Sequence, residues 1–272
     1  MGKRQIAQIL DNKVVKVGQS SFMSIETEKT RRAYDIGKSS GLFRVPRVLA
    51  FDPTSGRLEL ELLTAIRPLR LVLRDCSDWK NLMARIGQSL ALIHNQLCLP
   101  PALAVPLSES WQLTNSETVV LHGDFGITNV QVDERDGNLV ILDWSVMPML
   151  DTNGTVGPRE FDVAWFMRDL FFVRRRWGFL SKRASQEADV FLENYFAKTK
   201  CRRDIDEFLH YLRNIEGLFL QRWRASFSVT YPRRVDYLLH AGRYRRYIRS
   251  SKLQSKCSKI FQKTDTNTKP NK

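Results

Sequence analysis

The chain has 272 residues, 43% of them hydrophobic, which is enough for one or two domains with a sizeable core. No apolar run approaches the ~20 residues of a membrane-spanning helix. The first residues, 1–5, lack a secretory hydrophobic region, so we expect a protein that is not exported. Its four cysteines are far apart and form no Cys-x-x-Cys pair, which argues against zinc and favours a reducing cytoplasm.

The charge of the chain is unevenly distributed. Residues 1–158 hold 17 basic and 17 acidic side chains, whereas residues 159–272 hold 26 basic and 12 acidic ones, and so carry the whole net charge of +14. Such asymmetry concerns partners rather than fold. It indicates that the C-terminal half faces something anionic, or at least not a polycation.

The N-terminal elements are predicted to be mostly strands. Turn residues and alternating apolar residues indicate strands at 5–10, 13–17, 47–51 and 57–63, with Asp11-Asn12 as a tight turn. The segment 24–37 is predicted to be a helix with Ser24 as its N-cap and an end near Gly37.

The later elements are predicted to be mostly helices. Apolar residues at three- and four-residue spacing predict an amphipathic helix at 79–96. Short strands are expected at 119–121, 130–132 and 139–142, and helices from Phe161 onward. We therefore expect an α+β fold with an N-lobe at 1–66, a larger helical C-lobe at 67–262 and a basic disordered tail at 263–272.

One short segment carries residues typical of phosphoryl transfer. The run Leu121–Val130 contains Asp124 and, five residues later, Asn129, and the apolar strand that follows leads into Asp143-Trp144. These residues can supply a base near an attacking hydroxyl and two oxygen ligands for Mg²⁺. Taken singly, an Asp that caps a turn and an Asn in a loop are common. The full set with its flanking strands favours the catalytic interpretation.

This motif resembles that of the aminoglycoside phosphotransferase family, which includes choline kinase-like and other small-molecule kinases. The resemblance covers roughly residues 5 to 225 in the expected order. Besides His-Gly-Asp-x-x-x-x-Asn and the Asp-Trp strand, it rests on these segments: Val14–Val17, Ile25–Lys29, Val45–Leu49 and Gly157–Ala164.

The resemblance implies a two-lobed protein-kinase-like fold that uses ATP and Mg²⁺. It implies that Asp124 accepts or orients the proton of the acceptor hydroxyl, that Asn129 and Asp143 hold Mg²⁺, and that Lys16 binds the nucleotide phosphates. An ordinary exposed lysine of an edge strand is the alternative for Lys16. As the partner of Lys16 we choose Glu28 over Glu26.

Three further residues are expected to be structural rather than catalytic. His122 is predicted to order the catalytic loop by hydrogen bonding, and His94 to be a packed histidine. Asp162 resembles the second acid of the family and is expected to tie the catalytic loop to the following helix.

The chain departs from the family at its N-terminus. Only fifteen residues precede Lys16, whereas the family normally has a further strand and a phosphate-covering loop there, and no Gly-x-Gly-x-x-Gly cradle is found. We therefore expect an apparently truncated N-lobe, either from a shortened start or because phosphate binding depends on Lys16 and Mg²⁺ with a minimal lid.

The arginine-rich C-terminal half favours a neutral or anionic acceptor, such as a sugar, a phosphorylated sugar or a glycan attached to a lipid, over an aminoglycoside. The sequence thus predicts an ATP- and Mg²⁺-dependent phosphotransferase with an alcohol group of a small molecule or glycan as acceptor. It leaves ATP versus GTP and the oligomeric state open. The basic arginines are Arg174–Arg176, Arg202, Arg203, Arg222, Arg224, Arg233, Arg234, Arg243, Arg245, Arg246 and Arg249.

Two alternatives remain. A catalytically idle kinase-like fold could bind nucleic acid or an anionic membrane surface through its basic half, although the intact catalytic residues argue against it. A protein kinase is disfavoured because Gly123 stands where such enzymes have Arg. The stretch 244–261 alternates apolar and basic residues. It fits either a peripheral contact with the inner face of the membrane or a solvated basic helix.

Overall fold

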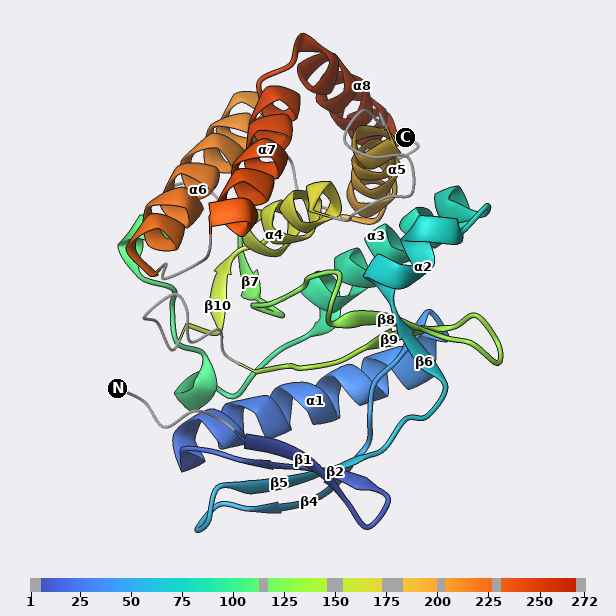
Figure 1. Cartoon of the computed structure of the whole chain (residues 1–272), viewed down its shortest axis with the longest axis vertical. Helices are drawn as coiled ribbons and strands as arrows, with labels where there is room; N and C mark the ends of the chain where they lie inside the picture. The colour runs from blue at the N-terminus through green and yellow to red at the C-terminus, as the bar shows by residue number, and fades with distance from the viewer. Residues whose placement is uncertain are drawn as a thin grey trace, which may run out of the picture. The chain divides into compact units, whose positions relative to one another are not determined.

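A computed structural model describes residues 6–112, 117–145, 154–172, 183–199, 204–226 and 231–267, without the side chains of 222–226, 231–237 and 263–267. The described chain is α+β, as predicted (Figure 1). It divides into two compact units, one of residues 1–72 and 92–162 and one of residues 73–91 and 163–272.

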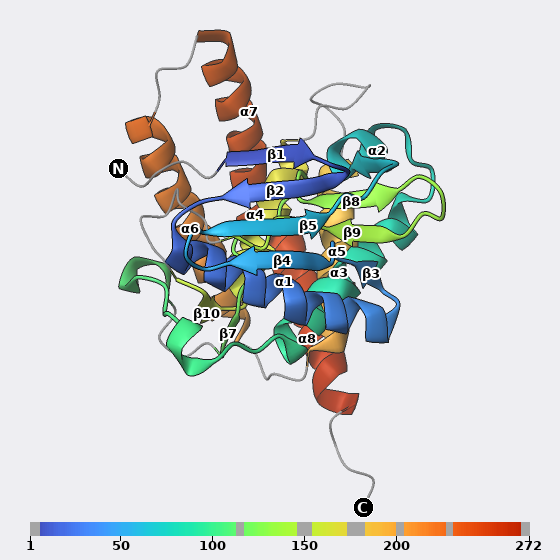
Figure 2. The same cartoon turned by 90° about the horizontal axis from the view of Figure 1, so that it is seen from below.

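The first unit contains a four-stranded antiparallel sheet. Its strands are β1 (Ile6–Leu10), β2 (Lys13–Val17), β4 (Val48–Asp52) and β5 (Arg57–Glu61), in the order β1-β2-β5-β4 (Figure 2). The β1–β2 hairpin forms at the predicted turn, where Asp11 and Asn12 have φ of 47° and 60°. Two successive residues with positive φ match the right-handed twist of the strands, and Asp and Asn tolerate that conformation.

Helix α1 (Ser20–Ser40) packs on this sheet and on the short strand β3 (Phe43–Arg44). It begins four residues before the predicted start. The predicted N-cap is therefore wrong: Ser24 lies inside the first turns and its hydroxyl donates to the carbonyl of Ser20 at 2.9 Å. The helix ends at Ser40, three residues beyond the predicted end near Gly37, and Gly41 caps it: its φ of 67° allows its N–H to bond the carbonyl of Gly37.

A second four-stranded sheet carries the catalytic segment. Its order is β3-β9-β8-β6, with β6 at Ile66–Pro68, β8 at Val130–Asp133 and β9 at Leu139–Ile141. A separate pair joins β7 (Thr118–Val120) and β10 (Val156–Pro158). Short 3₁₀ turns at Pro101–Leu103 and Glu109–Trp111 precede β7. Helix α2 (Leu69–Asp75) and helix α3 (Trp79–Gln96), the latter with its predicted bounds, both pass from one unit to the other.

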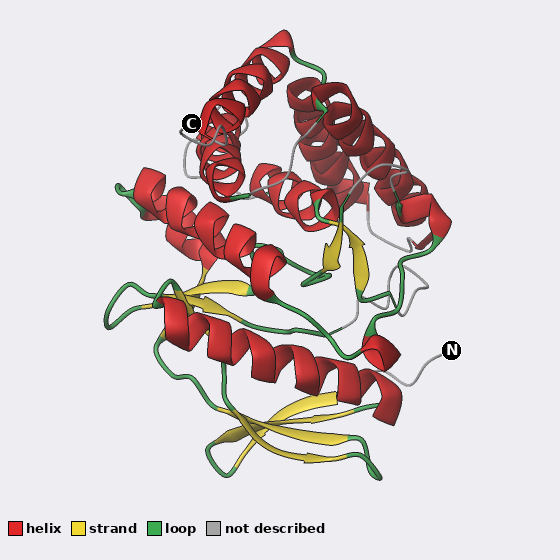
Figure 3. Cartoon of the chain, turned by 180° about the vertical axis from the view of Figure 1, so that it is seen from behind, coloured by secondary structure: helices red, strands yellow, loops and turns green. Residues whose placement is uncertain are grey.

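The second unit is helical in its described part (Figure 3). Besides the start of α3 it contains α4 (Glu160–Phe171) from Val163 onward, α5 (Arg183–Lys198), α6 (Ile205–Ser226), α7 (Tyr231–Ile248) and α8 (Ser251–Asn267). Aromatic rings fill its core: Phe196 packs edge-on against both Phe208 and Phe261 at centroid distances of 5.2 and 4.8 Å. None of the described helices is long and apolar enough to cross a bilayer.

Two boundaries differ from those predicted. The compact units do not divide at residue 66: residues 92–162, which we assigned to the C-lobe, lie in the same unit as the N-terminal sheet, because β3 pairs with β9 and α1 packs on β3. The tail predicted from residue 263 is helical as far as Asn267, since α8 continues beyond the buried Ile260 and Phe261. Residues 268–272 lie outside the described part.

Candidate active site

Lys16 lies at the centre of an ion-pair cluster in the first unit. Its ammonium is 2.5 Å from a carboxylate oxygen of Glu26 on α1 and 2.9 Å from one of Asp143, just beyond β9. Burial by itself would lower the pKa of Lys16, but the charges of the two carboxylates outweigh it and raise the pKa above its usual value. Lys16 is therefore a buried, charged and paired lysine, not an ordinary exposed one.

The predicted partner of this lysine is wrong. Glu28 lies on another side of α1 and pairs with Arg32, one turn along the helix, at 2.6 Å. Residues two apart in a helix are separated by about 200° around its axis, so Glu26 and Glu28 cannot both face β2. The face that contains the buried residues of α1 includes Glu26, whose side chain is 2% exposed.

Asp143 is held in an unusual backbone conformation. Its φ of 57° is in the left-handed region, which a non-glycine residue adopts at a cost that the surrounding structure must offset. Burial would raise the pKa of its carboxyl group, but Lys16 holds it below the usual value, so the group is ionised at neutral pH. Its side chain remains 38% exposed, so part of the carboxylate is accessible to a ligand.

Asp124 and Asn129 form a compact turn. The amide nitrogen of Asn129 donates to the carboxylate of Asp124 at 2.8 Å and to its backbone carbonyl at 2.9 Å. Because both donors of the Asn129 side chain are turned toward Asp124, its carbonyl oxygen is left as the acceptor for a further group. That oxygen is the atom a metal ion would need.

The β8–β9 hairpin brings this turn and Asp143 to the same end of the two paired strands. Val130 pairs with Ile141, and the N–H of Leu142 donates to the carbonyl of Asn129 at 2.9 Å. Asn129 and Asp143 are thus the residues that flank one end of a two-stranded ladder. The structure brings together four of the five predicted site residues, and Glu26 takes the place of the fifth.

Asp162, in the first turn of α4, holds the catalytic loop. One of its carboxylate oxygens accepts the N–H of His122 at 2.7 Å and the other accepts the N–H of Gly123 at 2.9 Å. The ring of His94 lies 3.0 Å from the same carboxylate, and both side chains are buried. The supporting roles expected for Asp162 and His94 agree with this arrangement.

His122 is a neutral histidine of defined tautomer. Its Nδ1 accepts the N–H of Asp124 at 3.3 Å, so its Nε2 carries the proton and donates to the carbonyl of Leu142 at 3.1 Å. Burial, followed by the nearby charge of Lys29, lowers the pKa of His122 to about 4. It joins the catalytic loop to the strand before Asp143, which agrees with an ordering role.

Sequence reasoning did not single out Lys29. It lies three residues after Glu26 on the buried face of α1, and its ammonium donates to the carbonyl of His122 at 2.7 Å. Burial lowers its pKa to about 8, although the charges of four nearby carboxylates oppose the effect. A lysine among the apolar positions of an amphipathic helix is a signal that could have identified it.

The donor atoms fit Mg²⁺. In the described residues no three His, Cys, Asp or Glu side chains gather into a metal cluster. Mg²⁺ bound together with a nucleotide needs only one or two protein ligands, because phosphates and water complete its octahedron. The carboxylate of Asp143 and the carbonyl oxygen of Asn129 are hard donors of the kind this ion prefers.

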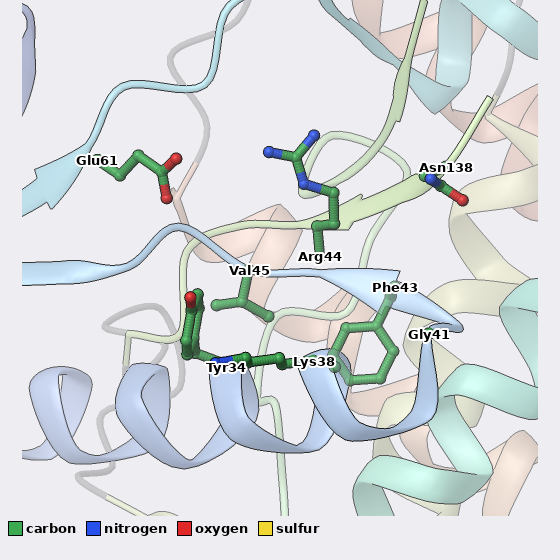
Figure 4. A pocket seen from close by; sticks show the side chains of 9 residues that line it. Tyr34, Lys38, Gly41, Phe43, Arg44, Val45, Glu61 and Asn138 are labelled. Atoms are coloured by element: carbon green, nitrogen blue, oxygen red, sulfur yellow. The ribbon is translucent and has the colours of Figure 1, made fainter. Parts of the chain in front are cut away.

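A separate pocket of about 330 Å³ lies at the C-terminal end of α1, away from these residues (Figure 4). Phe43 and Val45 line its apolar part, and the side chains of Arg44 and Glu61 point toward one another across it. None of the catalytic residues lines it, so it is not part of the candidate active site.

Comparison with known proteins gives a likeness of fold. No protein-family model matches the sequence, and no curated protein is significantly similar to it. A choline/ethanolamine kinase family protein from Mesorhizobium loti has a TM-score of 0.54 and 12% identity, over 96% of this chain and 91% of that one. The choline kinase LicA from Streptococcus pneumoniae has a TM-score of 0.48 and 16% identity, over 91% and 90%.

The aminoglycoside phosphotransferase APH(3'')-Id from Streptomyces rimosus has a TM-score of 0.44 and 14% identity, over 78% of this chain and 91% of that one. At these identities the likeness concerns the fold, not the substrate. The chain has the kinase-like α+β fold that its motifs predicted.

Proposed function

We propose that the protein is a phosphotransferase that moves the γ-phosphoryl group of ATP, with Mg²⁺, to a hydroxyl group of a small molecule or glycan. The observation that supports this most is the ion-pair cluster of Lys16, Glu26 and Asp143. It lies in the same unit as the Asp124–Asn129 turn, next to one end of the β8–β9 hairpin. Clusters of buried, paired charges with shifted pKa values are concentrated at functional sites.

Each residue has a definite task in such a reaction. The ammonium of Lys16 has three N–H groups, of which Glu26 and Asp143 take two, so the third can donate to a phosphate oxygen. Glu26 fixes the direction of that ammonium. Bound Mg²⁺ would neutralise phosphate charge, held by Asp143 and the carbonyl oxygen of Asn129.

Asp124 acts on the acceptor. Its carboxylate orients the attacking hydroxyl and receives its proton as the new oxygen–phosphorus bond forms and the bond to the β-phosphate oxygen breaks. The hydrogen bond from Asn129 keeps the carboxylate in one rotamer. Because the transition state of phosphoryl transfer is loose, this positioning contributes more than the basicity of the carboxylate.

We also propose that the acceptor is neutral or anionic, on the basis of the charge of residues 159–272.

The membrane contact that we considered would be electrostatic. In the stretch 244–261 the apolar side chains of Tyr247, Ile248, Leu253 and Ile260 are buried in the second unit. They are therefore not available for insertion into a bilayer, whereas Arg246 and Arg249 are exposed. Cytoplasmic location, peripheral contact with an anionic membrane and nucleic-acid binding remain predictions.

The test of the proposed function is a screen for ADP production. It covers sugars, phosphorylated sugars, amino alcohols, nucleosides and aminoglycosides, with ATP and GTP compared in parallel. Asp124→Asn is the blank, since it should bind Mg·ATP normally and turn over nothing, whereas Asp143→Ala should lose the Mg²⁺-dependent part of nucleotide binding. The proposal fails if Mg·ATP gives neither heat in a calorimeter nor a thermal shift with the unmodified protein. Turnover of aminoglycosides alone would overturn the acceptor assignment.

A further inference from the structure

Lys29 is a buried cation of the first unit that the proposed mechanism does not use. Its side chain is 1% exposed, and burying an ammonium this completely is costly unless its charge is compensated. The compensation comes from the carboxylates of Asp162, Glu26, Asp143 and Asp124, named in the order of their effect on it. Every one of these carboxylates belongs to the candidate active site or supports it.

The contact of Lys29 is with the backbone of the catalytic loop. Its ammonium donates to the carbonyl of His122 at 2.7 Å, and this carbonyl belongs to the peptide that enters Gly123. Gly123 has φ of 89°, and a Cβ atom there would lie 3.6 Å from the carbonyl oxygen of Ser145 and 4.0 Å from the Lys29 ammonium. The ammonium thus lies close to the glycine of the catalytic loop.

Glu26 and Lys29 share one face of α1. A separation of three residues is about 300° around the helix axis, so the two side chains leave the same side one turn apart. Glu26 holds Lys16, and Lys29 holds the loop of Asp124. One rigid helix therefore contacts both the group expected to bind phosphate and the loop expected to bind the acceptor hydroxyl.

We propose that Lys29 is a positioning residue for phosphoryl transfer: through the carbonyl of His122 it fixes the Asp124 loop relative to helix α1, and hence relative to Lys16. This inference rests on the proposed function for its effect on turnover. The hydrogen bond between Lys29 and the carbonyl of His122 does not depend on that function.

The charge of Lys29 has a second effect, on metal binding. Its positive charge lies among the carboxylates of Asp143 and Asp124 and reduces the negative potential there. Removing this charge should strengthen the binding of Mg²⁺, even though it loosens the loop. A residue with a purely structural role would act in the opposite direction, because a loosened site binds the ion less well.

The experiment compares Lys29→Met with Lys38→Met, an exposed lysine on the same helix. Hydrogen–deuterium exchange of the amides of residues 122–129, measured without nucleotide, reports on the loop. It should become about tenfold faster in Lys29→Met, because a hydrogen bond from a charged donor is lost, and should not change in Lys38→Met. Calorimetric titration with MgCl₂ alone should show binding tighter by roughly threefold or more.

Turnover supplies the remaining readout. On the best acceptor of the screen, kcat of Lys29→Met should fall roughly 100-fold while KM for ATP stays within about threefold, as expected for lost positioning rather than lost binding. If Lys29→Met does not fold, Lys29→Gln replaces it. Because Gln is neutral but can still form a hydrogen bond, Mg²⁺ binding is then the deciding measurement: it should tighten, and unchanged or weaker binding would overturn the proposal.

Unchanged exchange in the loop, or weaker Mg²⁺ binding, overturns the proposal. If the unmodified protein phosphorylates no acceptor and binds no Mg·ATP, the proposed function fails. The exchange measurement still decides whether Lys29 fixes the loop.

Discussion

The substitution Glu26→Gln tests which glutamate serves the phosphate-binding lysine. The Lys16–Glu26 pair is short, at 2.5 Å, and its side chains are 11% and 2% exposed. Breaking a buried ion pair from one side typically costs about 3–5 kcal/mol, because the remaining charge stays buried without its partner. Here Lys16 keeps Asp143 at 2.9 Å, so we expect the lower part of that range, about 3 kcal/mol.

Glu28→Gln is the matched control. Its partner Arg32 is four residues along the helix, and the two side chains are 25% and 36% exposed. Such a pair contributes about 0.3–0.5 kcal/mol. The two substitutions are chemically identical and two positions apart, so their difference isolates the effect of the Lys16 pair.

The assay is urea unfolding followed by tryptophan fluorescence, together with calorimetric titration of Mg·ATP. Glu26→Gln should lower the free energy of unfolding by about 3 kcal/mol and weaken Mg·ATP binding, since Lys16 loses the group that directs its ammonium. Glu28→Gln should change both quantities little. Equal effects of the two substitutions, or a loss below about 0.5 kcal/mol for Glu26→Gln, would refute the assignment.

Two further predictions concern stability. The pKa of His122 is about 4 in the folded protein and about 6.5 in the unfolded chain, so between these pH values the unfolded state binds more protons. The free energy of unfolding should therefore fall by about 3 kcal/mol as the pH drops from 6.5 to 4. Urea unfolding at several pH values should show that this free energy falls less in His122→Gln than in the unmodified protein. An equal fall in both proteins would contradict the prediction. Arg168→Leu should lower the free energy of unfolding by about 3 kcal/mol or more, because it leaves Glu216 buried without its closest partner. The loss should be smaller at pH 5, because burial raises the pKa of Glu216 and favours its neutral form. Arg245→Leu, whose guanidinium is 3.7 Å from the same carboxylate and 40% exposed, should cost under about 1 kcal/mol; thermal unfolding that ranks the two variants the other way would exclude this account.

The catalytic motif could be predicted because its parts are close in sequence. Asp124 and Asn129 lie in one turn, and a short hairpin places Asp143 beside them, so local pattern and strand pairing suffice. The long helix at 79–96 was predicted with its observed bounds for the same reason, since its apolar spacing is local. The β1–β2 turn at Asp11 and Asn12 is a further local feature.

The sequence by itself predicted the kinase-like order of elements from local patterns, and the residues Lys16, Asp124, Asn129 and Asp143 from their resemblance to a family motif. Short-range pairing places Asp124, Asn129 and Asp143 together, whereas Lys16 reaches Asp143 from 127 residues away in the sequence. Only the tertiary structure decided which side of α1 faces β2 and the catalytic loop, because that rotation depends on packing of the helix against two sheets. A helix turns by 100° per residue. That geometry selects Glu26 over Glu28 and places the Lys29 ammonium against the carbonyl of His122.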